Sequence, residues 1–369
     1  MTKLIQRLAG MGVAKTRLRP KLFGPAHSGP ARLLTVADFG ANPGRLGMRR
    51  FVPEGLAAGA PLVVVLHGCQ QDAEGYDAGT GWSQLAARHG FALLYPAQQT
   101  ANNPMNCFKW YEPGATARQG GEVESILAMV ARMQRDHAID PSRIFVTGLS
   151  AGGAMASSLL ASAPDVFAGG AIIAGLPHGA AASVGEALQV MRQPHALSPA
   201  AWGDKVRSAH GFTGRRPSVS IWHGTADTTV VPDNAEASLA QWANVLGLES
   251  REAEFRAGAG HTHRLWRDET GGIRLEAWSI AGMAHGTPIA PHAANAAQRL
   301  GAPAPYILDA GLASTWHIAE GWGLLDTPAR MDARPAQPTA DAAPADPAPP
   351  ESGVTAVIHQ ALRAAGLMK

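Results

Sequence analysis

Short, continuous apolar runs alternate with helix-like stretches through most of the chain. The apolar runs are continuous rather than alternating, which is typical of strands that are covered on both faces. We predict strands at 62–66, 91–95, 144–147, 171–174, 219–222 and 275–280, and helices at 82–89, 122–137, 151–161 and 234–246. Regular succession of strand and helix favours the α/β class, with a doubly wound, mostly parallel sheet.

The composition divides the chain into a large folded part and appendages. Its 369 residues fit one large α/β domain with appendages about as well as two ordinary domains. We predict the folded domain at 46–328, after an N-terminal extension at 1–45, with an antiparallel edge strand at 48–52. The segment 329–352 is rich in proline, alanine and aspartate and is predicted to be a flexible linker.

An amphipathic pattern returns after the linker, at 353–369. Its apolar residues recur at helical spacing on one face: Val354, Val357, Ile358, Ala361, Leu362 and Ala365. We expect a short helix there, which either docks on the main domain or interacts with a partner or a hydrophobic surface.

Charge and hydropathy argue against several classes of partner. The formal net charge of +2 is too small to indicate nucleic acid or a membrane surface. No apolar run approaches the roughly 20 residues that a membrane span needs. Arg7 interrupts the apolar N-terminal stretch and Lys15 follows soon after, so we do not predict a secretory signal peptide. The two cysteines, Cys69 and Cys107, leave a disulfide, a metal half-site or neither open.

The stretch RIFVTGLSAGGAMA carries the pattern Gly-x-Ser-x-Gly around Ser150. A strand-like run precedes it and a helix former follows, which is the context of a nucleophile elbow. Gly148 and Gly152 are small because side chains at those positions would collide with the neighbouring strand and helix. The turn would present the hydroxyl of Ser150 at the start of the helix, where free backbone N–H groups can stabilise an oxyanion.

A nucleophilic serine needs a base and an orienting acid, which follow it along the chain in this fold. Asp227 comes just after the predicted strand 219–222, and His285 just after the predicted strand 275–280. We therefore select Asp227 and His285. The competitors have polar, helical or loop contexts: Asp204, Asp233, Asp268, His261, His263 and His292. We interpret the His-x-His pair among them as surface or loop histidines, since no third metal ligand accompanies it.

The second half of an oxyanion hole usually follows an early strand. The segment LVVVLHGCQQ provides such a turn, and the backbone N–H of Cys69 is our candidate donor, with that of Ala151 as the second. We interpret His67 as a structural loop residue.

These motifs together carry a family resemblance. LHGCQQ, NCFKWY, GLSAGG, HGTADTTV and GMAHG resemble the esterase family of poly(3-hydroxybutyrate) depolymerases, which is related to feruloyl and acetylxylan esterases. The similarity runs from about Met48 to the segment LDAGLASTWHIAEGWGL. It implies an α/β-hydrolase catalytic domain at 46–328, with Ser150 as nucleophile, Asp227 as orienting acid and His285 as base. It also implies a disulfide between Cys69 and Cys107 that anchors the oxyanion loop.

The expected activity is hydrolysis of carboxylic esters through an acyl-enzyme, with no metal or organic cofactor. The expected substrate is poly(3-hydroxybutyrate), a short-chain polyhydroxyalkanoate or its oligomers. The alternatives are a feruloyl, acetylxylan or general short-chain esterase and, in another class, a non-catalytic polymer-granule-binding protein. Phe108, Trp110 and Tyr111 either line the acyl site or cap the core. The family and the disulfide favour an extracellular or periplasmic location, and the missing signal peptide favours the cytoplasm.

Overall fold

A ten-stranded sheet runs through the computed structural model, which describes residues 32–248 and 252–325. The order of its strands across the sheet is β1-β2-β4-β3-β5-β6-β7-β10-β9-β8. Along the chain the strands are β1 (Leu34–Val36), β2 (Gly47–Phe51), β3 (Leu62–Leu66), β4 (Ala92–Ala97), β5 (Ile144–Leu149), β6 (Gly169–Ile173), β7 (Ser218–Gly224), β8 (Glu254–Gly258), β9 (His261–Arg267) and β10 (Ile273–Ile280). The six strands from β4 to β10 are parallel, and all six predicted strands lie among them.

The flanks of the sheet are antiparallel. β2 pairs with β4 in the antiparallel sense, as predicted for 48–52. The prediction that it is the edge strand is wrong, because β1 pairs outside it, with Leu34 opposite Arg50. β1 has three residues, too few to give a periodic signal. At the other end, β9 and β8 add a hairpin to β10.

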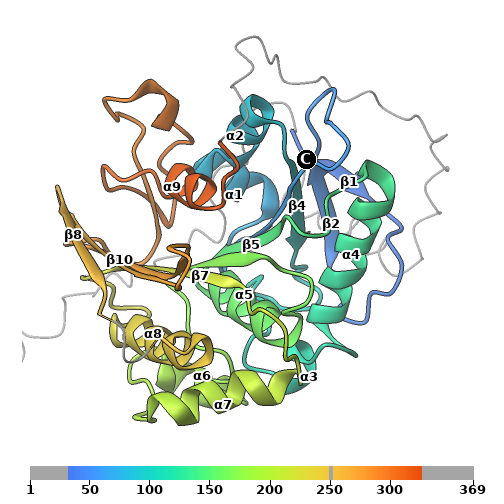
Figure 1. Cartoon of the computed structure of the whole chain (residues 1–369). Helices are drawn as coiled ribbons and strands as arrows, with labels where there is room; N and C mark the ends of the chain where they lie inside the picture. The colour runs from blue at the N-terminus through green and yellow to red at the C-terminus, as the bar shows by residue number, and fades with distance from the viewer. Residues whose placement is uncertain (1–31, 249–251, 326–369) are drawn as a thin grey trace, which may run out of the picture. The chain divides into compact units, whose positions relative to one another are not determined.

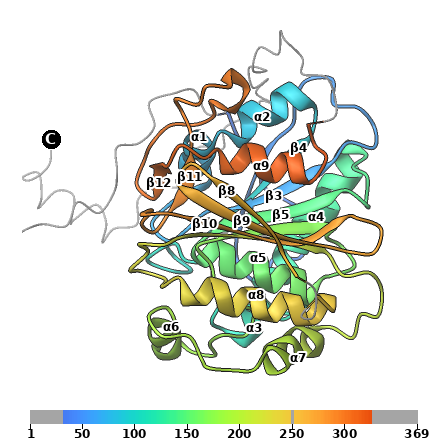
Figure 2. The ribbon, with the colours of Figure 1, turned by 60° about the vertical axis from the view of Figure 1, so that its left-hand side comes forward.

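Helices cover both faces of the sheet (Figures 1 and 2). One apolar core joins the sheet to α4 (Glu122–His137), α5 (Ala151–Ser162) and α8 (Asp233–Leu246). A second core joins the other face to α1 (Ala73–Thr80), α2 (Trp82–His89) and α9 (Ser314–Gly321). Two apolar cores on opposite faces explain why the parallel strands are apolar without alternation. The fold is an α/β-hydrolase fold.

Smaller elements complete the described part of the chain. They are α3 (Pro113–Thr116), α6 (Val184–Val190), α7 (Pro199–Ala209), a 3₁₀ turn at Ala296–Gln298, and a two-stranded parallel sheet of β11 (Thr287–Ile289) and β12 (Ile307–Asp309). None of the helices in residues 32–248 and 252–325 is long and apolar enough to span a membrane.

The predicted appendages fall largely beyond these residues. Residues 1–31 of the N-terminal extension, the linker at 329–352 and the helix at 353–369 lie outside the described residues. The domain boundaries around them stay predictions.

Candidate active site

The strand order reverses between β3 and β5. From β3 the chain crosses to β4 on one side, and then to β5 on the other. At such a switch point the connections leave a crevice at the carboxyl ends of the two strands, where open α/β sheets bind their ligands. Cys69 lies in the turn after β3, and Ser150 lies directly after β5. The fold therefore brings these two predicted residues to one place.

Ser150 sits in a strained turn between β5 and α5. Its φ of 57° and ψ of −118° are unusual for a residue with a side chain. The turn is tight because the glycines around it are packed against backbone. A Cβ atom on Gly152 would lie 2.5 Å from the carbonyl oxygens of Leu66 and His67, and one on Gly153 would lie 2.8 Å from that of Ile173. This packing agrees with the predicted reason for glycine here.

His285 bridges the serine and an aspartate. Its Nε2 lies 2.8 Å from Oγ of Ser150, and its Nδ1 lies 2.7 Å from Oδ2 of Asp227. His285 and Asp227 are buried, whereas Ser150 is half-buried. The structure thus brings together the three side chains that the sequence selected, in the order nucleophile, imidazole and carboxylate.

Asp227 is held in its charged form. Burial alone would raise the pKa of this carboxyl group, but hydrogen bonds from histidines and from the backbone outweigh it and hold the pKa well below its usual range. The partners are His285, the backbone N–H groups of Thr229 and Val230, each 2.9 Å from Oδ1, and His223, whose Nε2 lies 3.4 Å from Oδ2.

His223 is a functional residue that the sequence did not reveal. This buried side chain lies on β7, and its Nε2 is also 2.8 Å from the carbonyl oxygen of Val230. It therefore ties the strand to the turn that follows Asp227. The sequence signal was a histidine directly after the predicted strand 219–222, four positions before the aspartate.

Two backbone N–H groups are candidate oxyanion donors, one in the residue after Ser150 and one in the turn after β3. They belong to Ala151, in the first turn of α5, and to Cys69. Within the described residues neither N–H has a hydrogen-bond acceptor, although the flanking N–H groups of Gly68 and Gln70 do. Free N–H groups at a helix start and an adjacent loop are the usual donors to an oxyanion.

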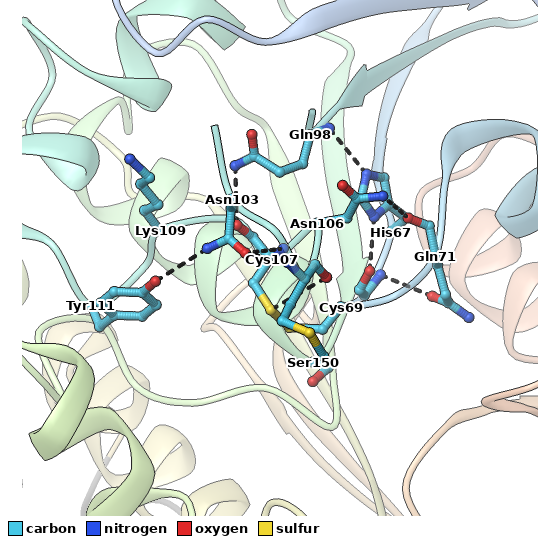
Figure 3. The surroundings of a disulfide bond; sticks show 12 residues. His67, Cys69, Gln71, Gln98, Asn103, Asn106, Cys107, Lys109, Tyr111 and Ser150 are labelled. Carbon is cyan, nitrogen blue, oxygen red and sulfur yellow. Dashed lines mark hydrogen bonds between the residues drawn. A yellow bond between two sulfur atoms is a disulfide. The ribbon is translucent and has the colours of Figure 1, made fainter. Parts of the chain in front are cut away.

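The turn after β3 is crosslinked to a second loop. Cys69 and Cys107 form a disulfide with their Cα atoms 4.3 Å apart, shorter than the roughly 5.5 Å expected of an average bridge. Figure 3 shows the bond, Ser150 and the surrounding hydrogen bonds. The predicted pairing is confirmed, and it fixes the backbone of Cys69 to the loop that leads into Trp110.

A buried carboxyl group supports the second loop. Glu122 accepts hydrogen bonds from the side-chain amide of Gln98, at 2.7 Å, and from the backbone N–H of Lys109, at 2.8 Å. Gln98 also donates to the carbonyl oxygen of Cys107 at 3.0 Å. Burial raises the pKa of Glu122 to about 7, against the lowering effect of these donors.

His67 has a structural role, as predicted. Its Nδ1 lies 2.8 Å from the carbonyl oxygen of Gly68, and its Nε2 accepts a hydrogen bond from the backbone N–H of Gln98 at 3.1 Å. Burial lowers the pKa of this imidazole. With both nitrogens occupied by backbone groups, His67 holds the β3 turn against β4.

Ser150 and His285 open into a pocket of about 510 Å³. Trp110 and Tyr111 line it, together with residues of the β3 turn, the disulfide, α6 and Tyr306. Phe108 does not line it. This side chain is fully buried in the core, with its ring 5.0 Å from that of His67, so its prediction as a substrate-binding residue is wrong. Because the three aromatics are consecutive or nearly so, sequence could not tell which of them faces inward.

The prediction for the His-x-His pair is also wrong. Both residues lie on β9 rather than in a loop. His263 is buried, with its Nε2 2.7 Å from Oε2 of Glu276 and its ring stacked on Trp278 at 3.8 Å. By contrast, the side chain of His292 is exposed. In residues 32–248 and 252–325 there is no group of three or more histidine, cysteine or acidic side chains that could hold a metal ion.

Backbone strain gathers around the pocket. Four of the seven non-glycine residues with positive φ in the described part of the chain line the pocket or flank the disulfide: Gln70, Asn106, Ser150 and Tyr306. Unfavourable backbone conformations persist only where the surrounding structure enforces them, and they are common at functional sites.

Comparisons with known proteins identify the family of the chain. Residues 46–273 match the family described as esterase PHB depolymerase. Poly(3-hydroxyalkanoate) depolymerase C of Paucimonas lemoignei is 42% identical over 307 residues, which cover 83% of this chain and 73% of that protein. Feruloyl esterase B of Thermothelomyces thermophilus is 36% identical over 263 residues, covering 69% of this chain and 88% of that protein.

A solved structure supports the fold. The acetyl xylan esterase from Aspergillus awamori superimposes with a TM-score of 0.63 at 28% identity, covering 69% of this chain and 93% of that one. Because the family match covers more than half of the chain and a relative is 42% identical over most of it, the chain belongs to the esterase PHB depolymerase family of carboxylic ester hydrolases.

Proposed function

We propose that this serine-type esterase uses Ser150, His285 and Asp227 to hydrolyse poly(3-hydroxybutyrate), a related short-chain polyhydroxyalkanoate or its oligomers. The observation that carries the proposal is the pair of short contacts made by His285, to Oγ of Ser150 and to the carboxylate of Asp227. This arrangement suits an imidazole that takes a proton from the serine while the carboxylate fixes its tautomer.

In the first half of the reaction, Oγ of Ser150 bonds to the ester carbonyl carbon as His285 Nε2 takes the hydroxyl proton. The carbonyl oxygen becomes an oxyanion, which the N–H groups of Cys69 and Ala151 stabilise by about 3 kcal/mol each. The bond to the alcohol oxygen then breaks, and His285 returns the proton to the leaving alkoxide. Asp227 stabilises the imidazolium throughout.

In the second half, water replaces the alcohol. His285 takes a proton from the water as its oxygen attacks the acyl-enzyme, and gives a proton back to Oγ of Ser150 as the acid leaves. The low pKa of Asp227 keeps a negative charge beside the imidazole during both steps.

The residues that line the pocket match an apolar, uncharged acyl chain. Apart from His285 and two tyrosines, none of the residues that line it is ionisable. The apolar members are Met105, Trp110, Leu149, Val184, Ala187, Leu188 and Met191. Three of them, Met105, Val184 and Leu188, are also among the most exposed large apolar side chains of the described residues. Apolar surface continues from the pocket to its rim, which suits a chain of repeated ester units.

The second candidate is an esterase acting on feruloyl or acetyl groups of polysaccharides. The names of several relatives favour it, since they are feruloyl esterases and acetylxylan esterases. Bound polysaccharide would place hydroxyl groups over the rim, where Met105, Val184 and Leu188 offer no side-chain hydrogen bonds. We therefore rank it second.

A comparison of products tests the proposal. Purified wild-type chain should hydrolyse p-nitrophenyl butyrate, and Ser150→Ala should not. The chain should release 3-hydroxybutyrate or its oligomers from a film of poly(3-hydroxybutyrate). This release should be faster than that of ferulate from methyl ferulate or of acetate from acetylated xylan. Faster release of ferulate or acetate would favour the second candidate, and no ester hydrolysis at all would favour a non-catalytic binding protein.

A further inference from the structure

Tyr306 occupies a turn position that normally takes glycine. Residues 304–307 form a tight turn closed by hydrogen bonds between the backbone of Ala304 and that of Ile307, at 2.9 and 3.2 Å. Pro305 fits the first central position, and Tyr306 fills the second with a φ of 63°. A turn with this positive φ after proline favours glycine or asparagine, and a bulky aromatic there is an outlier.

The rest of the fold enforces this conformation. The side-chain amide of Gln71 donates to the carbonyl oxygen of Pro305 at 3.0 Å, and the backbone N–H of Thr287 donates to that of Tyr306 at 2.9 Å. Gln71 belongs to the same turn as Cys69, and Thr287 follows His285 by two residues. The turn is therefore tied to the two segments that carry the oxyanion donor and the base.

Tyr306 lines the pocket beside the base. Its ring lies edge-on to the imidazole of His285, with the ring centroids 6.0 Å apart and the planes at 76°. The phenolic hydroxyl has no hydrogen-bond partner among the described residues, whereas the hydroxyl of Tyr111, also at the pocket, is held in place by the side-chain amide of Asn103, from which it accepts a hydrogen bond at 3.3 Å. The ring of Tyr306 thus lies beside His285 in the pocket lining, and its hydroxyl is an unused donor among the described residues.

That side is where the alcohol portion of an ester must lie. His285 has to protonate the leaving alkoxide, so the alcohol oxygen must face Nε2 while the carbonyl oxygen faces Cys69 and Ala151. In a poly(3-hydroxyalkanoate) the alcohol portion is itself a hydroxyacyl unit, and its own carbonyl group stands two carbons beyond the alcohol carbon. A donor beside His285 is placed to meet an acceptor of this kind.

We infer that Tyr306 is a specificity-determining residue whose hydroxyl donates a hydrogen bond to a carbonyl group in the alcohol portion of the substrate. The inference rests on the proposed function and deepens it, because it distinguishes an ester whose alcohol carries a further acyl group from a simple alkyl ester. It also gives a reason for a strained tyrosine where glycine would fit without strain.

The test compares two racemic esters with the same acyl group and alcohols of equal length. Ethyl 3-(butyryloxy)butanoate carries a carbonyl in its alcohol portion, and heptan-2-yl butyrate does not. The measured quantity is kcat/KM for release of butyrate, taken as the ratio of its value for the first ester to its value for the second. In Tyr306→Phe, which keeps the ring, this ratio should fall about three- to tenfold, the range for one neutral hydrogen bond. Tyr306→Gly, which suits the turn, should lower the ratio at least as much, and Tyr111→Phe should leave it unchanged.

The other outcomes would overturn the inference. Tyr306→Phe could leave the ratio unchanged, either by slowing hydrolysis of both esters equally or by slowing neither. In both cases the hydroxyl does not bind the alcohol portion of the substrate. A fall of the ratio in Tyr111→Phe of the same size would show that the effect is not specific to Tyr306. Failure of the wild-type chain to hydrolyse either ester would instead overturn the proposed function, and the inference with it.

Discussion

Two histidine–carboxylate pairs of this molecule, each with a buried imidazole, can be compared directly. His285 lies 2.7 Å from Asp227 in the loops after β10 and β7, and His263 lies 2.7 Å from Glu276 across β9 and β10. The distance between the two groups is the same. The surroundings of the second ring nitrogen and of the ring face differ, and these decide which histidine can act as a base.

At the first pair, the free nitrogen of His285 meets the hydroxyl of Ser150 at the edge of a pocket. At the second, the ring of His263 is stacked on Trp278, which also donates its Nε1–H to Glu276 at 3.2 Å and stacks on Trp222 with the ring centroids 4.4 Å apart. The second pair holds strands together. A histidine–carboxylate hydrogen bond by itself therefore does not identify a catalytic base.

Removing the hydroxyl that distinguishes the first pair should have the largest effect. Ser150→Ala should lower kcat/KM on p-nitrophenyl butyrate by about three or more orders of magnitude, because the nucleophile is lost and the three groups act as a unit. Its thermal unfolding should stay close to that of the wild type, since Oγ is the one atom removed. Substantial residual activity in a correctly folded variant would contradict the assignment.

Matched substitutions of the two histidines should separate catalysis from stability. His285→Ala should also cost about three orders of magnitude in kcat/KM. His263→Ala should change kcat/KM by less than about threefold, but should lower the free energy of unfolding by about 1–3 kcal/mol, because Glu276 loses the hydrogen bond from His263 and Trp278 loses the ring stacked on it. Urea denaturation and steady-state kinetics on the same preparations give both quantities. An equal loss of activity in the two variants would mean that the wrong base was chosen.

The fold class and all six parallel strands could be predicted from the sequence, since continuous apolar runs indicate strands that are buried on both faces. The hairpin of β8 and β9 could not. β8 is exposed throughout, and its segment EFRAG has no apolar pattern to reveal a strand. The burial of His263 could not be predicted either, because it depends on Trp278 and Glu276, which lie on another strand.

Among the site residues, local motifs and their order were sufficient for Ser150, Asp227 and His285, which lie at the ends of predictable strands. Their catalytic roles stay predictions until the variants are measured. Tyr306 had no local signal. It reaches His285 through the turn at 304–307, which is tied to Gln71 more than 200 positions earlier. Such a contact is set by tertiary structure, which a single sequence does not display.

A covalent link further distinguishes the His285 site. Reducing the disulfide, or replacing both cysteines by serine, should lower kcat/KM by up to about 100-fold, the contribution of one oxyanion donor, if the N–H of Cys69 loses its place. The closed loop of 38 residues should also contribute about 3–4 kcal/mol to the free energy of unfolding in the chain-entropy model. Thiol titration of the unfolded protein should find no free thiol before reduction and two after it. Full activity after complete reduction would show that the crosslink does not position the donor.

The last effect is on stability alone and concerns a carboxyl group with no histidine partner. Burial raises the pKa of Glu122 to about 7, above its value near 4.3 in the unfolded chain. Between these values the folded state binds a proton that the unfolded state does not, so this group's contribution to the free energy of unfolding is present below about pH 4 and is lost as pH rises through 7. Asp227, with its lowered pKa, has the opposite sign and loses its contribution on acidification.

Urea unfolding at pH 5, 6, 7 and 8 checks this for the wild type and Glu122→Gln. As pH rises, the free energy of unfolding of the variant should increase relative to that of the wild type, by up to about 3 kcal/mol across the range. Parallel curves for the two proteins would contradict the raised pKa.

We expect His285, and not His263, to activate Ser150. Labelling with a fluorophosphonate tests it most directly, because this reagent reports an activated serine without requiring the natural substrate. Peptide mass spectrometry of the wild type and of His263→Ala should find one adduct, on Ser150, formed at similar rates. In His285→Ala the adduct should form at least about 100-fold more slowly. An adduct on another serine, or labelling of Ser150 that slows in His263→Ala but not in His285→Ala, would contradict the account.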